Sequence, residues 1–347
     1  RVGSVRAGGL TTPDAAGVQA AFARLRDEGV RRVALEASSH GLAQFRLDGA
    51  RIDVAVLTQL GRDHLDYHAD EAEYAAAKAR LFAWPGLAAA VLNRDDAFGR
   101  ELCERLPAGV RCLTYGRDDA DLVAADVRCE PDGLALTVAM GARRRTVRLP
   151  LLGAFNADNA LAAAGALLAL GHAFDEVATR LERVRPVPGR MELFAAPGRA
   201  GVVVDYAHNA GALEAALAAL RPHARGRLWC IFGAGGDRDR GKRPLMGAAA
   251  VAGADRVIVT DDNPRGEDPA AIIDAILAGM PDGGSARVEH DRGRALRLAL
   301  EEAGPDDLIL LAGKGHETTQ TRGDAVLAWS DRDAAAAALA PPGGEAP

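Results

Sequence analysis

The stretch Val257-Ile258-Val259-Thr260-Asp261-Asp262-Asn263-Pro264-Arg265-Gly266-Glu267 decides the fold of the second half of this 347-residue chain. Its apolar opening predicts a buried strand, and its polar remainder predicts a loop before a helix that starts near Pro269. Ligands of an open α/β sheet bind at the carboxyl ends of its strands. Arg265 could therefore hold a carboxylate through two hydrogen bonds, while Asp262 or Asn263 accepts an ammonium. The loop alone fits a proline-containing turn with solvated charges equally well.

Strand-like and helical segments alternate on both sides of this loop. The strand-like segments lie at residues 202–206, 228–232, 256–260 and 308–311, with a weaker one at 325–329. This alternation predicts a mostly parallel, Rossmann-like sheet. Residues 184–190 carry two prolines and a glycine and are the best linker candidate. We therefore expect one domain at residues 1–184, a second at 185–340, and a tail at 341–347.

The first half of the chain shows a similar pattern with one addition. Short apolar runs at residues 32–37, 54–58, 89–93 and 111–115 predict strands. Residues 121–150 alternate with a period of two around Asp132-Gly133, which predicts a small hairpin sheet. The expected fold class is α/β, with a central, mostly parallel sheet and a small hairpin sheet, followed by a Rossmann-like domain.

Composition argues against several classes of function. Acidic residues outnumber basic ones, 48 to 42, which gives a formal charge of −6, and aromatic residues make up only 4% of the chain. We therefore expect no nucleic-acid partner. The four cysteines have no C-x-x-C spacing, which favours reduced thiols over a zinc or disulfide framework. The apolar stretches are too short for a membrane span, so we expect no membrane segment.

Two predicted strands in the first half lead to side chains that bind metals. The run at residues 32–37 contains Glu36 near its end, and the run at 54–58 leads toward His64. Neighbouring parallel strands would place both side chains at one sheet edge, which is a reasonable site for Mg²⁺. A zinc site at His64 and His68 lacks a third ligand and the H-E-x-x-H pattern, so we expect a structural role for His68.

Lys78 holds an unusual place on the helix expected at residues 71–82. Tyr74, Lys78 and Leu81 share one face at helical spacing, and this face is expected to point toward the core. A lysine in that position must be paired, modified or snorkelling. The pattern by itself does not decide between these states.

Further polar motifs lie beside the predicted strands. Gly313-Lys314-Gly315-His316-Glu317 follows the run at 308–311, where the glycines permit close approach of a ligand and Glu317 could accept an ammonium. Asn156 and Asn159 share a face in the first turn of a helix, although one of them could simply cap it. Residues 233–243 imitate two nucleotide-binding motifs. We reject both, because Arg238 replaces a required glycine and Arg243 a required hydroxyl.

Taken together, the motifs from about Gly9 to Asp331 resemble those of the Mur ligase family, and within it the branch that adds meso-diaminopimelate. The matching motifs, in chain order, are Leu10-Thr11-Thr12, Glu36-Ala37-Ser38-Ser39-His40-Gly41, Arg62-Asp63-His64-Leu65-Asp66-Tyr67-His68, the Lys78 helix, Phe155-Asn156 with Asn159, Gly189-Arg190-Met191-Glu192, Asp205-Tyr206-Ala207-His208, Gly235-Gly236-Asp237-Arg238-Asp239, Asp262-Asn263-Pro264-Arg265 and Gly313-Lys314-Gly315-His316-Glu317.

The resemblance implies an ATP- and Mg²⁺-dependent ligase acting on UDP-N-acetylmuramoyl-L-alanyl-D-glutamate in peptidoglycan precursor synthesis. ATP would phosphorylate the D-glutamate side-chain carboxylate, and an amine of meso-diaminopimelate would attack the acyl phosphate and release phosphate. The enzyme would contribute mainly positioning and charge neutralisation.

The same resemblance assigns roles to particular residues. The UDP-muramoyl-dipeptide would be held by Thr11, Thr12, Ser38, Gln44 and Arg46. The catalytic, Mg²⁺-binding set would be Glu36, His64 and Lys78, the last as a carbamate that supplies an anionic oxygen. ATP would contact Asn156, Asn159, Arg190, Asp205 and His208. Diaminopimelate would be bound by Arg238, Asp262, Asn263, Pro264, Arg265, Gly313 and Glu317, with Arg265 on the carboxylate that lysine lacks.

The sequence also departs from the family pattern. The family's phosphate-binding loop and its small uridine-gripping domain, both upstream of the Thr-Thr motif, are not in this sequence, and Gln59 stands where Asn is common. We therefore expect the chain to ligate weakly or not at all, as a monomer in the cytoplasm. The alternatives are a sister ligase that uses L-lysine or another amino acid, and a non-catalytic binding module.

Overall fold

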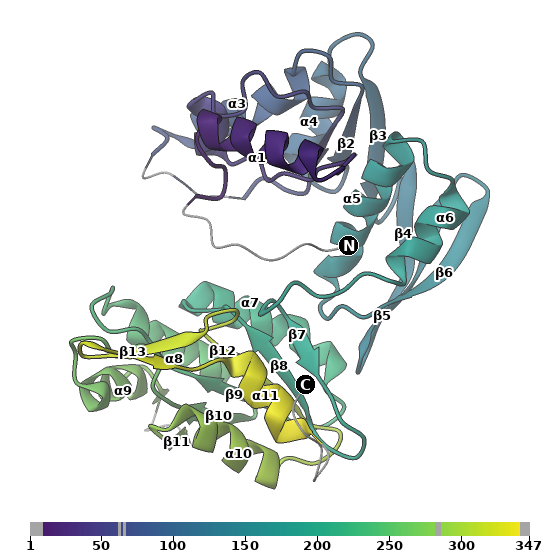
Figure 1. Ribbon diagram of the computed structural model, residues 1–347. Coiled ribbons are helices and arrows are strands. Elements are labelled where there is room, and N and C mark those ends of the chain that lie inside the picture. Colours follow the sequence, from purple (N-terminus) through teal and green to yellow (C-terminus); the bar gives the residue numbers. More distant parts are fainter. Residues whose placement is uncertain (1–9, 62–63, 65–66, 282–285, 341–347) are drawn as a thin grey trace. The chain divides into compact units, whose positions relative to one another are not determined.

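The structure is a computed structural model that describes residues 10–61, 64, 67–281 and 286–340 (Figure 1). The chain forms two compact units that interleave along the sequence. The first comprises residues 1–125, 137–145 and 158–179, and the second comprises residues 126–136, 146–157 and 180–347. The expected boundary at residues 184 and 185 stays a prediction, and the expected tail at 341–347 lies outside the described residues.

The first sheet contains six strands that lie side by side in chain order. They are β1 (Val54–Leu57), β2 (Ala89–Asn93), β3 (Arg111–Gly116), β4 (Leu122–Glu130), β5 (Gly133–Met140) and β6 (Arg143–Leu149). β1, β2, β3 and β4 are parallel neighbours. A two-residue turn joins β4 to β5, which confirms the expected hairpin, although its strands extend the parallel sheet instead of forming a separate one.

Helices accompany these strands. They are α1 (Ala15–Asp27), α2 (Ser39–Ala43), α3 (Glu71–Ala79), the short 3₁₀ turn η1 (Arg80–Ala83), α4 (Ala97–Arg105), α5 (Phe155–Ala169) and α6 (Phe174–Leu181). Leu57 and Leu92 pack with Phe82 and Leu102 in one core. Asp70 caps α3, because its carboxylate accepts a hydrogen bond of 2.8 Å from the Glu73 backbone N–H.

The strand expected at residues 32–37 does not form, and this prediction is wrong. The segment has no regular secondary structure, and Val33 and Leu35 are 48% and 40% exposed. A strand is stable only when its backbone groups pair with a neighbour. No described strand pairs with this segment, so its apolar pattern has no sheet to join.

The second sheet has the spatial order β11-β10-β9-β12-β8-β7. Its strands are β7 (Glu192–Phe194), β8 (Gly201–Asp205), β9 (Leu228–Phe232), β10 (Arg256–Val259), β11 (Arg287–Val288) and β12 (Leu308–Ala312). All neighbours are parallel except β7 and β8. The predicted Rossmann-like sheet is therefore confirmed, and the carboxyl ends of β8, β9, β10 and β12 lie at one edge.

Helices cover both faces of the second sheet (Figure 1). They are α7 (Ala210–Leu220), the 3₁₀ turn η2 (Arg221–His223), α8 (Lys242–Gly253), α9 (Pro269–Leu277), α10 (Arg292–Glu302) and α11 (Asp331–Leu339). Leu217 and Met246 belong to the core on one face, with Val203 and Leu310 of the sheet. Leu296 of α10 belongs to a second core cluster, which also contains residues of α11. Alternating sheet residues thus have apolar partners on each side.

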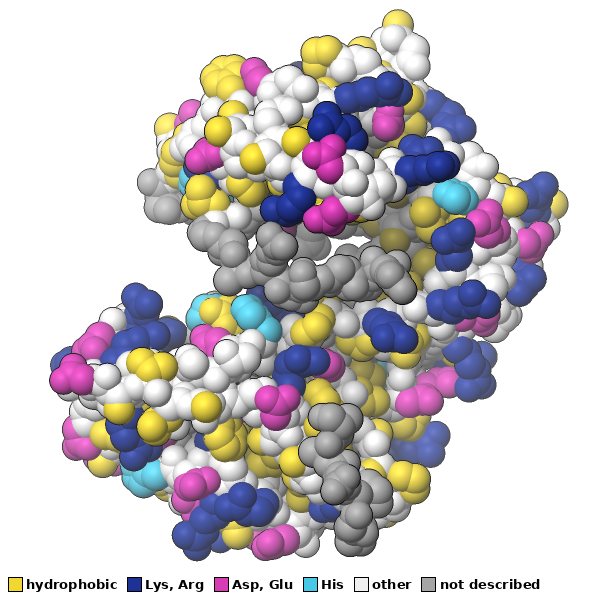
Figure 2. Space-filling view, viewed as in Figure 1, with side chains coloured by type: hydrophobic (Ala, Val, Ile, Leu, Met, Phe, Trp, Pro, Cys, Tyr) yellow, Lys and Arg dark blue, Asp and Glu magenta, His cyan; other side chains and the backbone are white. Residues whose placement is uncertain are grey.

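A short antiparallel hairpin, β13 (Thr319–Arg322) with β14 (Ala325–Ala328), follows the second sheet. The weak strand predicted at residues 325–329 therefore exists, but it pairs with β13 and not with the parallel sheet. No helix among the described residues is both long enough and apolar enough to cross a bilayer. On the face shown in Figure 2, acidic and basic side chains are interspersed over the described residues.

Candidate functional site

Four loops meet the carboxyl edge of the second sheet. They follow β8, β9, β10 and β12 and contain the motifs at residues 205–208, 233–241, 260–267 and 313–317. Parallel pairing of these strands brings the loops to the same edge, as the sequence predicted. This edge is the candidate site.

Residues 260–264 of the loop after β10 are buried, so the solvated turn considered from the sequence is wrong for this part of the loop. Asp262 is 8% exposed and Asn263 is 6% exposed. The hairpin holds this loop by its backbone and side chains: Gln320 Nε2 donates to the Asp262 carbonyl at 2.7 Å, and Arg265 N donates to the Thr321 carbonyl at 3.0 Å. This role of β13 could not be predicted from the sequence, because its polar residues show no motif.

Asp262 presents a carboxylate that receives no hydrogen bond from any residue that the structure describes. A Cβ added to Gly313 would lie 2.6 Å from Asp262 Oδ2, and the φ of Gly313 is +114°. Glycine is therefore required at position 313 both for its backbone conformation and for the close approach of the two loops. The arrangement leaves Asp262 available to a cationic ligand.

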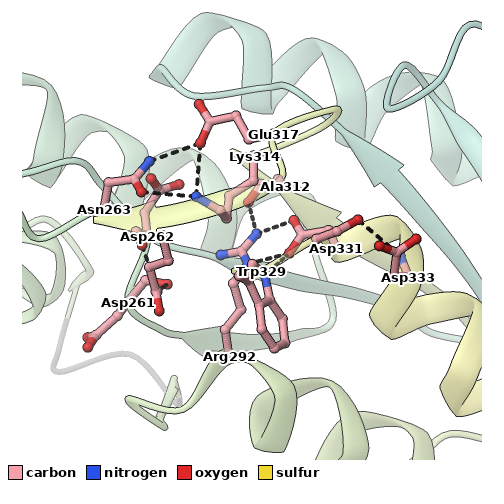
Figure 3. A network of polar contacts seen from close by, with 12 residues as sticks. Asp261, Asp262, Asn263, Arg292, Ala312, Lys314, Glu317, Trp329, Asp331 and Asp333 are labelled. Carbon is pink, nitrogen blue, oxygen red and sulfur yellow. Dashed lines mark hydrogen bonds and ion pairs between the residues drawn. The ribbon is translucent and has the colours of Figure 1, made fainter. Parts of the chain in front are cut away.

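Asn263 and Glu317 are joined through a buried lysine (Figure 3). Lys314 Nζ donates to Asn263 Oδ1 at 3.1 Å and to Glu317 Oε2 at 2.9 Å, and Asn263 Nδ2 donates to the same Glu317 oxygen at 2.9 Å. Lys314 is fully buried. The motif Gly313-Lys314-Gly315-His316-Glu317 by itself predicts no role for Lys314.

Arg265 lies at the same edge, and its guanidinium contacts the loop after β9 (residues 233–241), which we call the glycine-rich loop. Its Nη1 donates to the Gly236 carbonyl at 2.8 Å, and its backbone has a φ of +53°. Gly236 in turn donates from its N to the Asn263 carbonyl at 2.9 Å. Pro264 is buried, whereas Arg238 is exposed. The structure thus brings Asp262, Asn263, Pro264, Arg265, Gly313 and Glu317 to one edge, with Arg238 on a neighbouring loop.

Arg240, in the loop after β9, and Arg243, at the start of α8, both pair with Glu267 of the loop after β10. Arg243 is buried and binds Glu267 through Nη1 at 3.1 Å and Nη2 at 2.8 Å. The hydrogen bond from Arg243 and one from the Asp237 N–H lower the pKa of the Glu267 carboxyl to about 2. Burial lowers the pKa of Lys242, whose Nζ donates to the His208 carbonyl at 2.8 Å.

Replacing Gly236 with alanine is expected to destabilise this edge. The added Cβ would lie 1.8 Å from the Pro264 carbonyl oxygen, so the loop after β10 must move. We expect a loss of about 1–3 kcal/mol in unfolding free energy, measured by urea denaturation. Gly304→Ala is the matched control, because its added Cβ meets nothing within 4 Å. Equal stability of both variants would contradict the expectation.

The residues expected to contact ATP near β8 lie together. Asp205 ends β8 and accepts hydrogen bonds of 2.8 Å from the backbone N–H groups of Met191 and Ala207. The guanidinium of Arg190 lies 4.6 Å from the Tyr206 ring centre. His208 Nδ1 donates to the Tyr206 carbonyl at 2.8 Å. The Asp205 carboxylate thus fixes the turn that carries Arg190.

Asn156 and Asn159 lie in the first turns of α5, as the sequence predicted. Asn156 Nδ2 donates to the Leu152 carbonyl at 2.7 Å, and Asn159 is exposed. The turn before α5 is held by His223, whose Nε2 accepts from the Gly153 N–H at 2.8 Å. Burial lowers the pKa of His223, which favours the neutral ring that this hydrogen bond requires.

Four of the residues expected to hold the UDP-muramoyl-dipeptide form one network. Thr12 is buried; its Oγ1 donates to the Glu36 carbonyl at 2.8 Å and accepts from the Ser38 N–H at 3.0 Å. Arg46 Nη1 donates to the Thr12 carbonyl at 2.7 Å, and its Nε donates to Gln44 Oε1 at 2.9 Å. Thr11 is exposed beside Thr12.

The expected metal-binding residues are only partly brought together. His64 lies 5.9 Å from the Tyr74 ring, and Lys78 Nζ lies 5.4 Å from the same ring. The side chain of Glu36 is exposed, and its expected strand is missing. No three His, Cys, Asp or Glu side chains among the described residues could hold a metal ion. Lys78 and Leu81 are half-buried, His68 is 2% exposed, and residues 62, 63, 65 and 66 lie outside the description.

A second buried network under the edge was missed from the sequence. Arg292 starts α10, and its Nε and Nη2 each bind Asp331 of α11 at 2.7 Å. Arg292 Nη2 also donates to the Ala312 carbonyl at 2.7 Å, directly before Gly313 (Figure 3). Trp329 Nε1 donates to Asp331 at 2.8 Å. The pair of Arg292 and Asp331 therefore links the first residues of α10 and α11 to the end of β12.

The chain is therefore an α/β protein with two largely parallel sheets, and the second sheet has acidic and basic side chains at the carboxyl edge where ligands of such sheets bind. The chain belongs to the Mur ligase family: residues 2–167 match the Mur ligase middle domain and residues 189–315 match the Mur ligase glutamate ligase domain.

Two similar curated proteins carry the same name. The UDP-N-acetylmuramoyl-L-alanyl-D-glutamate--2,6-diaminopimelate ligase of Alkalilimnicola ehrlichii is 55% identical over 97% of this chain and 68% of that protein. The ligase of the same name from Pseudomonas syringae pv. tomato is 48% identical over 97% of this chain and 70% of that protein.

Solved structures of similar proteins include one with the same ligase name and others that share the fold. A structure with the same ligase name is 39% identical, covers 94% of this chain and 68% of that chain, and superposes with a TM-score of 0.75. Folylpolyglutamate synthase of Mycobacterium tuberculosis complexed with ADP shares the fold, with a TM-score of 0.63 at 24% identity over 84% of this chain and 67% of that chain.

Proposed function

We propose that this chain adds meso-diaminopimelate to the D-glutamate side-chain carboxylate of UDP-N-acetylmuramoyl-L-alanyl-D-glutamate, with ATP as co-substrate. The buried loop after β10 carries the proposal. It presents the Asp262 carboxylate, which receives no hydrogen bond from a described residue, beside Gly313, and the guanidinium of Arg265 at the same sheet edge. An amino-acid end with one ammonium and one carboxylate matches these charges. The relatives named above, at 48% and 55% identity, support the same activity.

The charges also indicate which end of diaminopimelate binds here. An ammonium held by Asp262 and Glu317 stays protonated, so it has no lone pair with which to attack an acyl phosphate. The edge would therefore hold the end that does not react, and the other amine would be the nucleophile. Arg265 would bind the carboxylate of the held end, which L-lysine lacks. Asn263 and Arg238 would complete this subsite.

The remaining assignments are proposals of the same kind. Arg190, Asp205, His208, Asn156 and Asn159 would contact ATP, and Thr11, Thr12, Ser38, Gln44 and Arg46 would contact the UDP-muramoyl-dipeptide. The buried Thr12 and the Asp205 carboxylate already bond backbone groups, so we propose that they act by holding the substrate-contacting loops. We further propose domains at residues 1–184 and 185–340, a monomer, and a cytoplasmic location.

We also propose that the chain binds Mg²⁺ through Glu36, His64 and a carbamate on Lys78. A carbamate on Lys78 would supply an anionic oxygen and His64 a ring nitrogen; the two side chains lie 5.4 and 5.9 Å from the centre of the Tyr74 ring. Glu36 would have to approach them, because its side chain is exposed and its segment forms no strand. The ion would neutralise phosphate charge when bound.

The test is amino-acid-dependent release of phosphate from ATP in the presence of UDP-N-acetylmuramoyl-L-alanyl-D-glutamate. We expect meso-diaminopimelate to bind the chain in calorimetry and to raise phosphate release above the values with L-lysine or no amino acid. The Alkalilimnicola ehrlichii relative is the positive control. Equal binding or equal release with L-lysine would indicate a sister ligase, and no binding of either amino acid would contradict the proposal.

A further inference from the structure

Lys314 is the only lysine among the described residues that is fully buried, and it lies beneath the proposed amino-acid site. Burying an ammonium is costly unless it is paired and hydrogen-bonded. Its Nζ meets Glu317 Oε2 at 2.9 Å and Asn263 Oδ1 at 3.1 Å. With no exposed surface, Lys314 cannot touch a ligand, so its role must pass through these two partners.

The hydrogen bonds of Asn263 fix the orientation of its amide. Its Oδ1 accepts from Lys314 Nζ and, at 2.9 Å, from the Thr321 N–H, while its Nδ2 donates to Glu317 Oε2. Flipping the amide would place an N–H against two donors, which is unfavourable. The amide therefore has one N–H left with which to reach a ligand.

The same bonds fix the two oxygens of Glu317. Oε2 receives both Lys314 and Asn263, whereas Oε1 receives no hydrogen bond from a described residue. The Glu317 side chain is 32% exposed, in contrast to the buried ammonium behind it. Glu317 thus keeps one oxygen, Oε1, that can accept from a ligand, on a side chain that is partly exposed.

We propose that Lys314 is a positioning residue for amino-acid recognition: by bridging Asn263 and Glu317 it aims the free Glu317 oxygen at the ligand's ammonium. The inference rests on the proposed function, because it takes an amino acid as the ligand of this edge. Lys314 would support the proposed diaminopimelate-binding residues without itself contacting substrate, cofactor or reacting atoms.

The charge of Lys314 has a second consequence. Burial raises the pKa of the Glu317 carboxyl, but hydrogen bonds from Lys314 and Asn263 outweigh burial and hold this pKa below its usual range. The other charged groups that face Glu317 are Arg265 from the loop after β10 and Arg292 from α10. Without Lys314, the pKa of Glu317 should rise, and the carboxyl should protonate as the pH falls.

The experiment compares calorimetric binding of meso-diaminopimelate to the wild-type chain and to Lys314→Met at several pH values between about 8 and 5.5. We expect the variant to bind at least about tenfold more weakly. We also expect its dissociation constant to rise further toward acidic pH, whereas the wild-type value changes less. A merely structural lysine would not produce this pH dependence. Arg297→Gln, which removes an exposed cation of α10, is the control and should bind as the wild type does.

The outcomes separate the two claims. A wild-type chain that binds no meso-diaminopimelate overturns the proposed function and this inference with it. A folded Lys314→Met that binds as tightly as the wild type at every pH overturns the inference alone. Should circular dichroism show that the variant is unfolded, carbon-13 NMR titration of Glu317 in the wild type decides: a pKa below the usual glutamate range supports the bridge, and an ordinary pKa refutes it.

Discussion

Replacing Arg265 with alanine should weaken the binding of meso-diaminopimelate about 50-fold and leave the weak binding of L-lysine nearly unchanged. A charged, bidentate hydrogen bond contributes roughly 2–3 kcal/mol, and only diaminopimelate has the carboxylate that this guanidinium would hold. Arg265 is well placed for this role because its guanidinium already lies over the glycine-rich loop, 2.8 Å from the Gly236 carbonyl. Calorimetry with both amino acids measures the change.

Two further variants sharpen this test. Arg265→Lys keeps a positive charge but loses the planar fork, so its loss should be intermediate. Arg240→Ala removes a neighbouring arginine whose side chain is 75% exposed and pairs with Glu267 at 3.1 Å. Because Arg243 also holds Glu267, this control should bind meso-diaminopimelate normally. Arg265→Ala with unchanged affinity for meso-diaminopimelate would remove Arg265 from the site.

The sequence predicts the second sheet well because its signals are local. Apolar runs such as Val257-Ile258-Val259 are long enough to identify strands, and parallel strands bring their following loops to one edge. The positions of Asp262, Arg265, Gly313 and Glu317 at this edge follow from that rule alone. The burial of Asp262 does not, because Gln320 of the hairpin at β13 and β14 holds its carbonyl, and the sequence of this hairpin is polar or weakly apolar.

The failures have a common physical origin in long-range pairing. The segment at residues 32–37 has the pattern of a strand, yet a strand requires a partner that the segment's own residues cannot reveal. Lys314 and Arg292 are also charged residues that are buried with the help of distant acceptors: Lys314 binds Asn263, 51 residues away, besides the nearby Glu317. Asp331 lies 39 residues after Arg292, and no spacing rule connects them.

The buried pair of Arg292 and Asp331 gives the largest expected effect on stability. Asp331 is 0% exposed and Arg292 is 2% exposed, and removing the carboxylate would leave a guanidinium buried without its counter-charge. We expect Asp331→Ala to lower the free energy of unfolding by about 3–5 kcal/mol in urea denaturation. Asp331→Asn should lose less, because an amide can still accept from Arg292 and from Trp329.

A double variant distinguishes the cost of an unpaired charge from the loss of packing. Arg292→Met with Asp331→Leu removes both charges and keeps apolar volume, so it should recover most of the stability that Asp331→Ala loses. Arg287 and Glu302 form an exposed pair at 47% and 56% exposure, and Glu302→Ala should change stability by less than about 0.5 kcal/mol.

The double variant would also test whether Arg292 supports amino-acid binding at the carboxyl edge of the second sheet. Arg292 Nη2 holds the Ala312 carbonyl directly before Gly313, so the stable double variant should still bind meso-diaminopimelate more weakly than the wild type. A loss below about 1 kcal/mol in Asp331→Ala would show that the buried guanidinium finds another partner.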